Sequence, residues 1–219
     1  MIVVTFTACD EKKNRIILLS SMTMDDNHKV KFEYDDQNRI VKMIHYTNNN
    51  EEPSETQTLT YDNEGGIEIT NEIEDFANAK FTRDGDTITT SDMNNSYVIT
   101  VSNDDFIVKI DSIWLYDPPE QKFFHYLDDN LIKTDGNGGN DEYKNDSYKT
   151  PFANCNTPKW FLQYHFGDWG INNIIETKPE KEAPRITEFE YDKQEFPVKR
   201  TVTLWSGNKS VTEYSYNNG

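Results

Sequence analysis

The fold is decided by a stretch in which apolar and polar residues alternate, KVKFEYDDQNRIVKMIHY, at residues 29–46. Its first half places Val30, Phe32 and Tyr34 on one face, because successive side chains of a strand point to opposite faces. The four polar residues DDQN at 35–38 are typical of a turn, and the residues that follow form a returning strand. The stretch therefore predicts an antiparallel β-hairpin.

The same pattern of strand, short polar turn and strand recurs along most of the chain. Further predicted strand–turn–strand units cover residues 56–73, 80–90, 97–110, 123–134, 186–204 and 196–216. The sequence shows no regular alternation of strands with helices, and it shows no glycine-rich phosphate-binding motif. We therefore predict an all-β fold, an antiparallel meander of about a dozen strands that forms an open or half-closed barrel-like sheet.

One segment, residues 135–184, interrupts this pattern. It opens with a loop rich in glycine, asparagine and aspartate, and it continues with prolines and several clusters of aromatic residues. We expect at most one or two short helices here, between Pro151 and Glu176. The expected organisation is a tether at 10–27 followed by a single β-domain at 28–219 that contains this irregular insertion.

Composition limits the possible functions. The chain has 219 residues, with 22 basic and 39 acidic side chains and a net charge of −17. This charge repels nucleic-acid phosphates and anionic lipid headgroups, so nucleic-acid binding and a basic membrane-surface helix are excluded. No apolar run reaches the roughly 18 residues of a spanning helix. Aromatic residues make up 13% of the chain, which predicts a thin, aromatic-rich core.

The first nine residues carry a second signal. An apolar stretch ends in small residues directly before Cys9, and FTAC at 6–9 resembles a bacterial lipobox, in which the cysteine thiol receives a diacylglycerol. Residues 1–9 are interpreted as the end of a lipoprotein signal whose basic start lies upstream. The alternative is an ordinary first strand with a buried cysteine. If Cys9 is lipidated, Cys155 has no disulfide partner and is expected to be a small buried thiol.

Four predicted strands end in the pair Tyr-Asp, at residues 34–35, 61–62, 116–117 and 191–192. In such a pair the tyrosine can pack across strands, and the aspartate can accept hydrogen bonds from the turn. The stretch FEYDDQNRI resembles the YD motif of Rhs-type repeats, with Asn38 where that motif has glycine. The spacing between the pairs is irregular, whereas repeat arrays keep a near-constant period.

The later stretches FEYDKQEFPVK at 189–199 and EYSY at 213–216 resemble the C-terminal end of a Bacteroidetes lipoprotein family of unknown function with a porin-like antiparallel β-fold. In that family a lipobox precedes YD-like hairpins and a middle segment that interrupts the sheet. Here Glu195 replaces the usual turn glycine. The resemblance implies an outer-membrane lipoprotein, and surface exposure fits the acidic residues that follow Cys9. The family has no known catalytic residues to transfer.

Catalytic and metal motifs are weak or absent in the sequence. The four histidines share no ligand spacing, no nucleophile motif is found, and no cofactor is expected. One loop starts like an EF-hand, which makes Asp135, Asn137 and Asp141 candidates for a weak calcium site. Gly139 and Asn140 are transposed against that motif. A solvated loop is the alternative.

Aromatic residues of the insertion are the candidate ligand-binding residues. Function tends to gather in irregular segments held by a rigid scaffold. We therefore expect Trp160, Tyr164 and Trp169 to line any binding surface, and Trp205 to be a core residue of a late strand. The alternative is that the three rings of the insertion fill the core.

Two classes of function follow from these features. The first is a lipid-anchored, non-enzymatic cell-envelope protein of unknown function with a binding or structural role. The second is a carbohydrate-binding or carbohydrate-active component of a surface glycan-uptake system. The expected contacts are the membrane through the lipid anchor alone and a glycan or protein partner, and the chain is expected to be a monomer.

Lipidation at Cys9 is directly testable. With an upstream start restored, Cys9→Ala should leave the precursor unprocessed, because the thiol that accepts the lipid is gone. The measurement is labelling with a fatty-acid probe in cells. Equal labelling of the variant and the wild type would contradict the lipobox interpretation.

Overall fold

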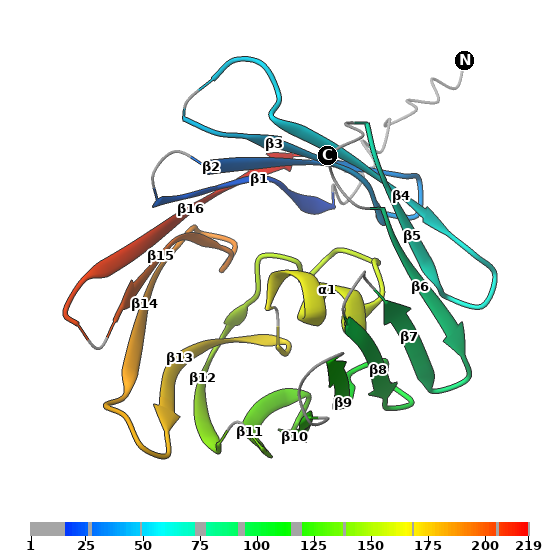
Figure 1. Ribbon diagram of the computed structural model, residues 1–219. Helices are drawn as coiled ribbons and strands as arrows, with labels where there is room; N and C mark the ends of the chain where they lie inside the picture. Colours follow the sequence, from blue (N-terminus) through cyan, green and yellow to red (C-terminus); the bar gives the residue numbers. More distant parts are fainter. Residues whose placement is uncertain are drawn as a thin grey trace, which may run out of the picture.

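The computed structural model describes residues 16–25, 28–48, 50–72, 78–91, 95–114, 120–137, 139–167, 169–204 and 206–218. Within them, sixteen antiparallel strands form a closed barrel around one α-helix (Figure 1). The strands are β1 (Ile17–Met24), β2 (His28–Tyr34), β3 (Ile40–Tyr46), β4 (Glu55–Tyr61), β5 (Ile67–Asn71), β6 (Ala79–Asp84), β7 (Thr87–Ser91), β8 (Asn95–Val101), β9 (Ile107–Trp114), β10 (Glu120–Leu127), β11 (Asn130–Gly136), β12 (Asp141–Lys149), β13 (Asn172–Pro179), β14 (Arg185–Tyr191), β15 (Pro197–Thr203) and β16 (Lys209–Asn218).

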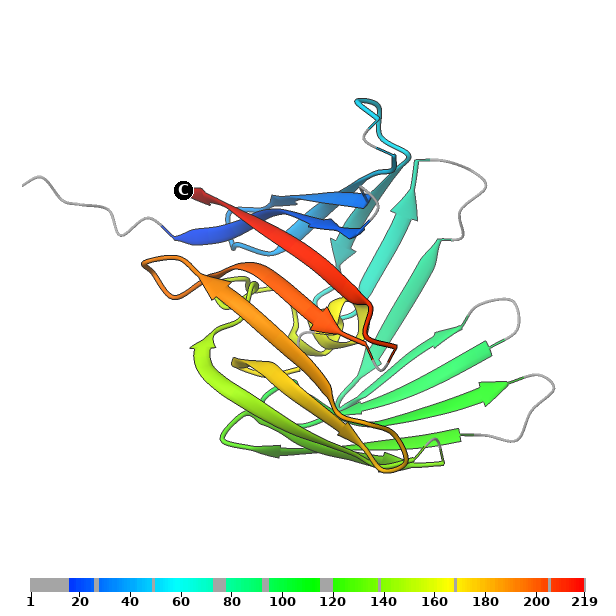
Figure 2. The same cartoon turned by 90° about the vertical axis from the view of Figure 1, so that its left-hand side faces the viewer.

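Each strand pairs with the next along the chain, and β16 pairs with β1 to close the barrel. In Figure 2 the last strand, in red, lies beside the first, in blue. The predicted antiparallel meander is confirmed, but the prediction of about a dozen strands in an open or half-closed sheet is wrong. Alternating residues and turn residues indicate local hairpins only. Closure of the barrel depends on the pairing of β1 with β16, for example Ile17 with Asn218, which are far apart in the sequence.

The missed strands lie where the sequence lacks apolar alternation. Strand β1 occupies part of 10–27, which was expected to be a tether, and its adjacent Leu18 and Leu19 are both buried beside a register shift. Strands β12 and β13 occupy part of 135–184, which was expected to be irregular. Their sequences are rich in polar residues. Both strands face a polar part of the barrel interior, so no apolar stripe marks them.

The helix lies where the sequence predicted one. Helix α1 (Lys159–Phe166) belongs to the segment 150–167, here called the plug, which runs inside the barrel (Figure 1). The left-handed conformation of Gly167 ends the helix, and its N–H donates to carbonyls of the last turn. No helix in the described part of the chain has the length and apolar character to cross a membrane.

The barrel wall has an apolar inner face and a charged outer face over much of its circumference. In β2, Val30 and Phe32 are buried, whereas Lys31 and Glu33 are exposed. The inner face between β3 and β9 packs against α1, and it supplies most of the core: Ile40, Met43, Leu59, Ile67, Ile69, Phe81, Ile88, Ile99, Val101 and Ile107. The plug therefore packs closely on one half of the barrel.

A repeated turn connects several hairpins. Asp35, Asp62 and Asp192 each use Oδ1 to accept hydrogen bonds from two backbone N–H groups of their own turn, at distances of 2.7–3.0 Å. Ser102 replaces the aspartate in a fourth turn, where its Oγ accepts from one N–H at 3.3 Å. The residue three positions after the aspartate or serine has a left-handed backbone in all four: Asn38, Gly65, Asp105 and Glu195. The turn explains the aspartate of the Tyr-Asp pairs; the pair at 116–117 lies outside the described residues.

Tyrosines near the strand ends form a second repeated contact. Each hydroxyl donates to a carbonyl near the start of the preceding strand: Tyr34 to Leu19, Tyr61 to Ile40, Tyr126 to Ile107 and Tyr216 to Pro197, at 2.6–2.9 Å. Burial raises the pKa of Tyr61 to about 12, so this hydroxyl keeps its proton and remains a donor. These four tyrosines are here called the tyrosine rim.

The plug is bound to the tyrosine rim by buried polar side chains. Thr157 Oγ1 accepts a hydrogen bond from the N–H of Ile40 at 2.8 Å, and it lies 3.3 Å from the hydroxyl of Tyr61. Gln163 Oε1 accepts from the N–H of Ile107 at 2.7 Å, while its Nε2 donates to the hydroxyl of Tyr126. The plug thus satisfies the first backbone N–H of two strands.

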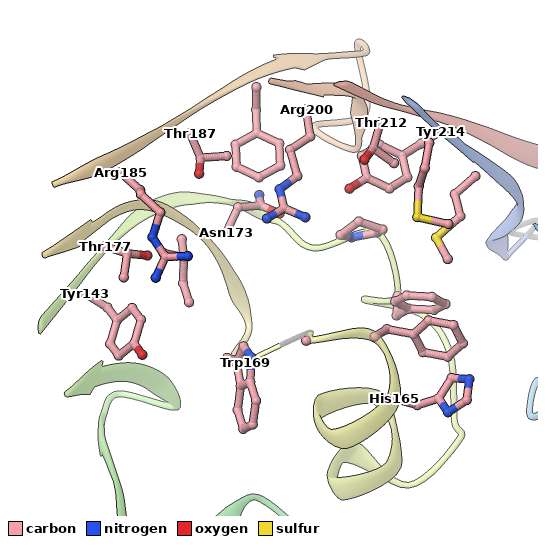
Figure 3. Close-up of a pocket in the computed structure, with 18 of the residues that line it drawn as sticks. Tyr143, His165, Trp169, Asn173, Thr177, Arg185, Thr187, Arg200, Thr212 and Tyr214 are labelled. Atoms are coloured by element: carbon pink, nitrogen blue, oxygen red, sulfur yellow. The ribbon is translucent and has the colours of Figure 1, made fainter. Parts of the chain in front are cut away.

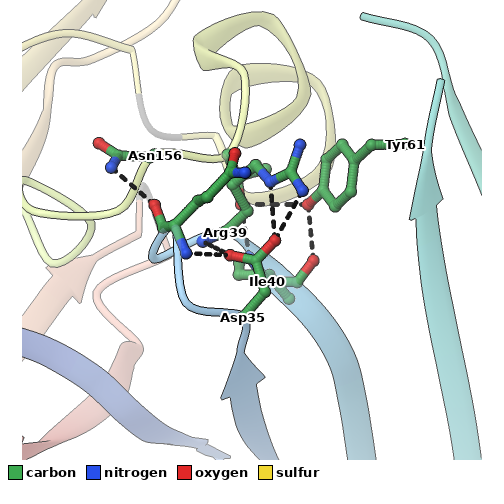
Figure 4. A network of polar contacts seen from close by, with 7 residues as sticks. Asp35, Arg39, Ile40, Tyr61 and Asn156 are labelled. Carbon is green, nitrogen blue, oxygen red and sulfur yellow. Dashed lines mark hydrogen bonds and ion pairs between the residues drawn. The ribbon is translucent and has the colours of Figure 1, made fainter. Parts of the chain in front are cut away.

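The plug also reaches the turn after β2 (Figure 4). Asn156 donates its side-chain N–H to the carbonyl of Gln37 at 2.7 Å and its backbone N–H to the carbonyl of Asn38 at 2.9 Å. In the same turn, Arg39 pairs with Asp35 at 2.7 Å and lies over the ring of Tyr61. The plug and the barrel therefore share one polar network and form one unit.

The turn geometry predicts that Glu195→Gly stabilises the protein. Glu195 has φ of 70°, a conformation that carries a steric penalty for side chains with a Cβ. We expect the free energy of unfolding to rise by about 0.5–1 kcal/mol, the relief of strain less the entropy that glycine adds to the unfolded chain. Urea denaturation measures it.

The matched control for this prediction is Gly207→Ala. Gly207 has φ of 82°, and a Cβ added there would meet no heavy atom within 4 Å. This variant tests backbone strain alone, and it should lose about 1 kcal/mol. A destabilised Glu195→Gly variant would contradict the strain assigned to this turn.

The hydrogen bond between Gln163 of the plug and the backbone of β9 predicts that Gln163→Leu destabilises the protein. Gln163 is 1% exposed, and leucine would leave the N–H of Ile107 buried without its partner. We expect a loss of about 2 kcal/mol in the free energy of unfolding. Gln121→Leu is the control, because Gln121 bonds Asp111 on the exposed surface, and it should change stability by at most about 0.5 kcal/mol. Equal effects of the two variants would show that the plug does not depend on this contact.

Candidate functional site

The inner half of the barrel that the plug leaves free contains a cavity of about 570 Å³. This volume lies within the range of small-molecule sites. Its wall comes from β12–β16, β1–β3 and one residue of β10, and its floor comes from both ends of the plug and the residues after it (Figure 3). The lining includes Met22, Met24, His28, Val30, His45, Lys122, Asp141, Tyr143, Pro151, Phe152, His165, Phe166, Gly167, Trp169, Asn172, Asn173, Ile174, Thr177, Arg185, Thr187, Phe189, Arg200, Thr212 and Tyr214.

Strand register places the polar lining residues in rows. Tyr143 on β12 pairs with Thr177 on β13, and Thr177 pairs with Arg185 on β14, so the three side chains share the inner face. The adjacent residues on β12 and β13 point outward, where Lys144 and Glu176 form an ion pair at 2.8 Å. The register thus separates an inner polar row from an outer charged pair.

A second row crosses the last three strands. Phe189 on β14 pairs with Arg200 on β15, which pairs with Thr212 on β16. Figure 3 shows Arg185 and Arg200 extending from neighbouring strands into the same cavity. The barrel therefore brings together two guanidinium groups that lie fifteen positions apart in the sequence.

These two arginines have no acidic partner within the described part of the chain. Neither guanidinium makes a hydrogen bond or an ion pair there, and Nε of Arg185 is buried without an acceptor. Asp141 is the carboxylate of the lining, and it accepts a hydrogen bond from the hydroxyl of Tyr143 at 3.3 Å. Lys122 adds a third cation. The lining thus carries more positive than negative charge, although the whole chain is strongly acidic.

A buried network fixes the wall beside the arginines. The backbone N–H of Asn173 donates to Asp146 at 3.1 Å, and its side-chain N–H donates to the carbonyl of Lys149 at 2.9 Å. The hydroxyl of Tyr191 donates to the same carboxylate of Asp146. Burial raises the pKa of Tyr191, which keeps this donor protonated. Together these contacts link β12, β13 and β14 behind the cavity.

Aromatic rings and histidines form the floor and one side. Trp169 stacks on Phe124 with 4.8 Å between ring centroids, and His165 stacks on Phe161 at 5.1 Å. Burial lowers the pKa of His165 to about 4, and burial also lowers the pKa of His45. These two rings are therefore neutral at pH 7, and the arginines and Lys122 supply the positive charge.

The structure separates the three predicted aromatic residues. Trp160 is fully buried at 0% exposure and packs on Phe81, so the expectation that it lines a binding surface is corrected. Tyr164 also packs on Phe81 and lies on the core side of the helix. Trp169 lines the cavity, and its role in binding stays a prediction. Helical geometry explains the split, because Trp160 and Tyr164 are four residues apart and share one face.

Other predicted site residues are distributed as follows. Cys9 and Trp205 lie outside the described residues. Cys155 is half-buried. Asp135 accepts from His125 at 2.7 Å and lies 3.4 Å from Lys133.

The calcium candidates form no evident metal site. Asp141 bonds Tyr143, and Asn137 is exposed. No group of three or more His, Cys, Asp or Glu side chains that could hold a metal ion occurs in the described ranges.

Sequence reasoning did not identify the polar residues of the cavity. Arg185, Arg200, Tyr143 and Asn173 belong to strands in which polar residues occupy both faces. The available signal is an arginine at an inward position of a strand whose next inward positions are Thr187 and Phe189. Recognising it requires knowing which face is inside.

Comparison with known proteins identifies the fold. No family model matches the chain, and no curated protein matches it. A solved structure described as a porin-like protein from Bacteroides uniformis is 12% identical, with a TM-score of 0.60, and covers 91% of this chain and 98% of its own. A porin-like protein from Bacteroides vulgatus is also 12% identical, with a TM-score of 0.40, covering 91% and 99%. The first likeness shows a shared β-barrel fold.

Proposed function

We propose that this protein is a non-enzymatic binding protein of the bacterial cell envelope that holds one small molecule inside its barrel. The observation that carries the proposal is the cavity between the plug and the inner wall of β12–β16. A barrel of this strand number encloses more space than its own side chains fill. The plug fills one half, and the other half has the size and the mixture of apolar and polar groups of a ligand site.

The polar lining supports binding rather than packing. Tyr143, Thr177 and Arg185 lie in one row. The hydroxyl of Tyr143 bonds Asp141, whereas Nε of Arg185 is buried without an acceptor in the described chain, which is costly unless a hydrogen-bonding partner reaches it. An apolar lining would stabilise an empty barrel better. The polar half-wall therefore fits a role in which a guest molecule supplies the partners.

The envelope location rests on the lipobox resemblance at Cys9 and on the fold shared with a Bacteroides protein. The outer wall carries charges such as Lys31, Glu33 and Glu68, which are exposed. Barrels embedded in lipid carry an apolar outer band instead. We therefore propose that the barrel stands in water and that a lipid on Cys9 attaches it to the outer membrane.

A carbohydrate ligand is the second candidate. Trp169 lies in the cavity with Asn172, Asn173 and Thr177, a combination of an aromatic ring with amide and hydroxyl groups that suits sugar rings. This candidate would place the protein in a surface glycan-uptake system as a binding component.

The test uses N-phenyl-1-naphthylamine, a neutral dye that fluoresces in apolar sites. We expect saturable fluorescence with one site per chain. Trp169→Ala should weaken binding about tenfold or more, since an aromatic contact is lost. Phe123→Ala is the control, because Phe123 neighbours the inward Phe124 but is exposed, and it should leave the affinity unchanged.

A second variant tests the proposal in case Trp169→Ala does not fold. Thr177→Trp would fill the cavity from the wall and should abolish dye binding while far-UV circular dichroism and the cooperativity of urea unfolding stay native. Saturation of Thr177→Trp at wild-type affinity, or no binding by the wild type, would contradict the proposal. Displacement of the dye by neutral oligosaccharides would favour the carbohydrate candidate.

A further inference from the structure

We propose that the molecule bound in the cavity carries an oxyanion (a carboxylate, phosphate or sulfate group) and that Arg185 and Arg200 bind it. This inference rests on the proposed function, because it specifies the chemistry of the guest in the same cavity. It concerns a small organic anion with an apolar or ring-shaped body, of a size that about 570 Å³ can hold.

The two cavity arginines differ from the other arginines of the described chain in having no acidic partner. Four of the five arginines lie in the described residues. Arg39 pairs with Asp35 at 2.7 Å, and Arg83 pairs with Asp105 at 2.6 Å. The two cavity arginines have no such partner in the described ranges, although the chain has 39 acidic residues available.

The missing carboxylate has an energetic consequence. A guanidinium group stays charged at any pH at which the protein is folded, so it cannot relieve burial by losing a proton. Nε of Arg185 is buried and has no acceptor within the described chain. An oxyanion would supply that acceptor, and it can bind a guanidinium through two parallel hydrogen bonds.

The strand geometry lets both arginines reach one guest. Arg185 and Phe189 lie four residues apart on β14, and Phe189 pairs directly with Arg200 on β15. At about 3.3 Å per residue, the two arginine backbones are on the order of 13–14 Å apart. Two extended side chains span most of that distance, and Figure 3 shows both directed into the cavity.

Neutral donors surround the two cations. Thr187 lies between Arg185 and Phe189 on the inner face of β14, and the hydroxyl of Tyr143 lies in the same row as Arg185. That hydroxyl donates to Asp141, which occupies the carboxylate of the lining, so Asp141 has a neutral partner of its own. A site with several donors and one carboxylate matches an anionic head group.

The apolar residues define the remainder of the guest. Trp169, Phe189, Met22 and Met24 line the same cavity. Their surface suits a ring or a short apolar body rather than a free inorganic ion. The combination therefore favours an organic acid or an acidic sugar derivative.

The experiment compares two dyes with the same aromatic body. 8-Anilino-1-naphthalenesulfonate carries an oxyanion, and N-phenyl-1-naphthylamine lacks it. The double variant Arg185→Gln with Arg200→Gln should weaken binding of the sulfonate by about tenfold to a hundredfold. Binding of the neutral dye should change by less than about twofold, since its contacts are apolar.

Lys199→Gln is the matched control. Lys199 precedes Arg200 on β15 but points outward, where it pairs with Glu190 at 3.0 Å. It removes one positive charge from the same strand without touching the cavity, so both dyes should bind as to the wild type. The single variants Arg185→Gln and Arg200→Gln are measured beside it. Equal losses of sulfonate binding in Lys199→Gln and in either of these two variants would overturn the inference, because net charge alone would explain them.

Competition in the wild type gives an independent measurement that does not require a folded variant. Sodium glucuronate, glucose 6-phosphate and glucose 6-sulfate are compared with glucose as competitors of the sulfonate dye. Better displacement by one acid than by glucose supports the inference, and it identifies which oxyanion is preferred. If no acid displaces the dye better than glucose, the inference is overturned.

The outcomes separate the two proposals. If the neutral dye binds at one site but the arginine variants do not weaken the sulfonate, this inference fails and the proposed function stands. If neither dye binds the wild type, the proposed function itself fails.

Discussion

The pairing of β1 with β16 is the contact on which the rest of the structure depends. It runs from Ile17 opposite Asn218 to Met24 opposite Thr212, and it joins two segments almost two hundred residues apart. Without it, the sheet would have two free edges, which attract other strands. With it, the sheet closes into a barrel that has an interior, and the candidate site lies in that interior.

The plug divides the interior into two unequal environments. Trp160 and Phe161 fill the half beneath β3–β9, where the wall is apolar. Thr157 and Gln163 bind the tyrosine rim by satisfying backbone N–H groups at the starts of β3 and β9. Packing and hydrogen bonding thus act on the same segment, which fixes where the remaining space lies.

The remaining space has a mixed lining, because its wall strands carry arginine, tyrosine, asparagine and threonine inward beside apolar residues such as Phe189. The same strands carry ion pairs such as Lys144 with Glu176 outward, so both faces are hydrophilic. The burial of apolar side chains is instead concentrated in the opposite half, where the plug packs on β3–β9. The backbone ladder runs around the whole barrel and holds the polar residues of β12–β16 in the wall, where the proposed ligand would contact them.

The sequence by itself determined the hairpins, their turns and the position of the helix, because alternation, Tyr-Asp pairs and proline act over a few residues. Asp35, Asp62 and Asp192 cap their turns as that local chemistry requires. Tertiary structure decided the closure, the count of strands and the site. In β14, Arg185 and Glu188 are both polar, and only the closed barrel turns the first inward and the second outward. In a sequence, the inward face of a strand is recognised by its apolar residues. Where the inward residues of a strand are polar because they line a cavity, the sequence no longer shows which face is inward.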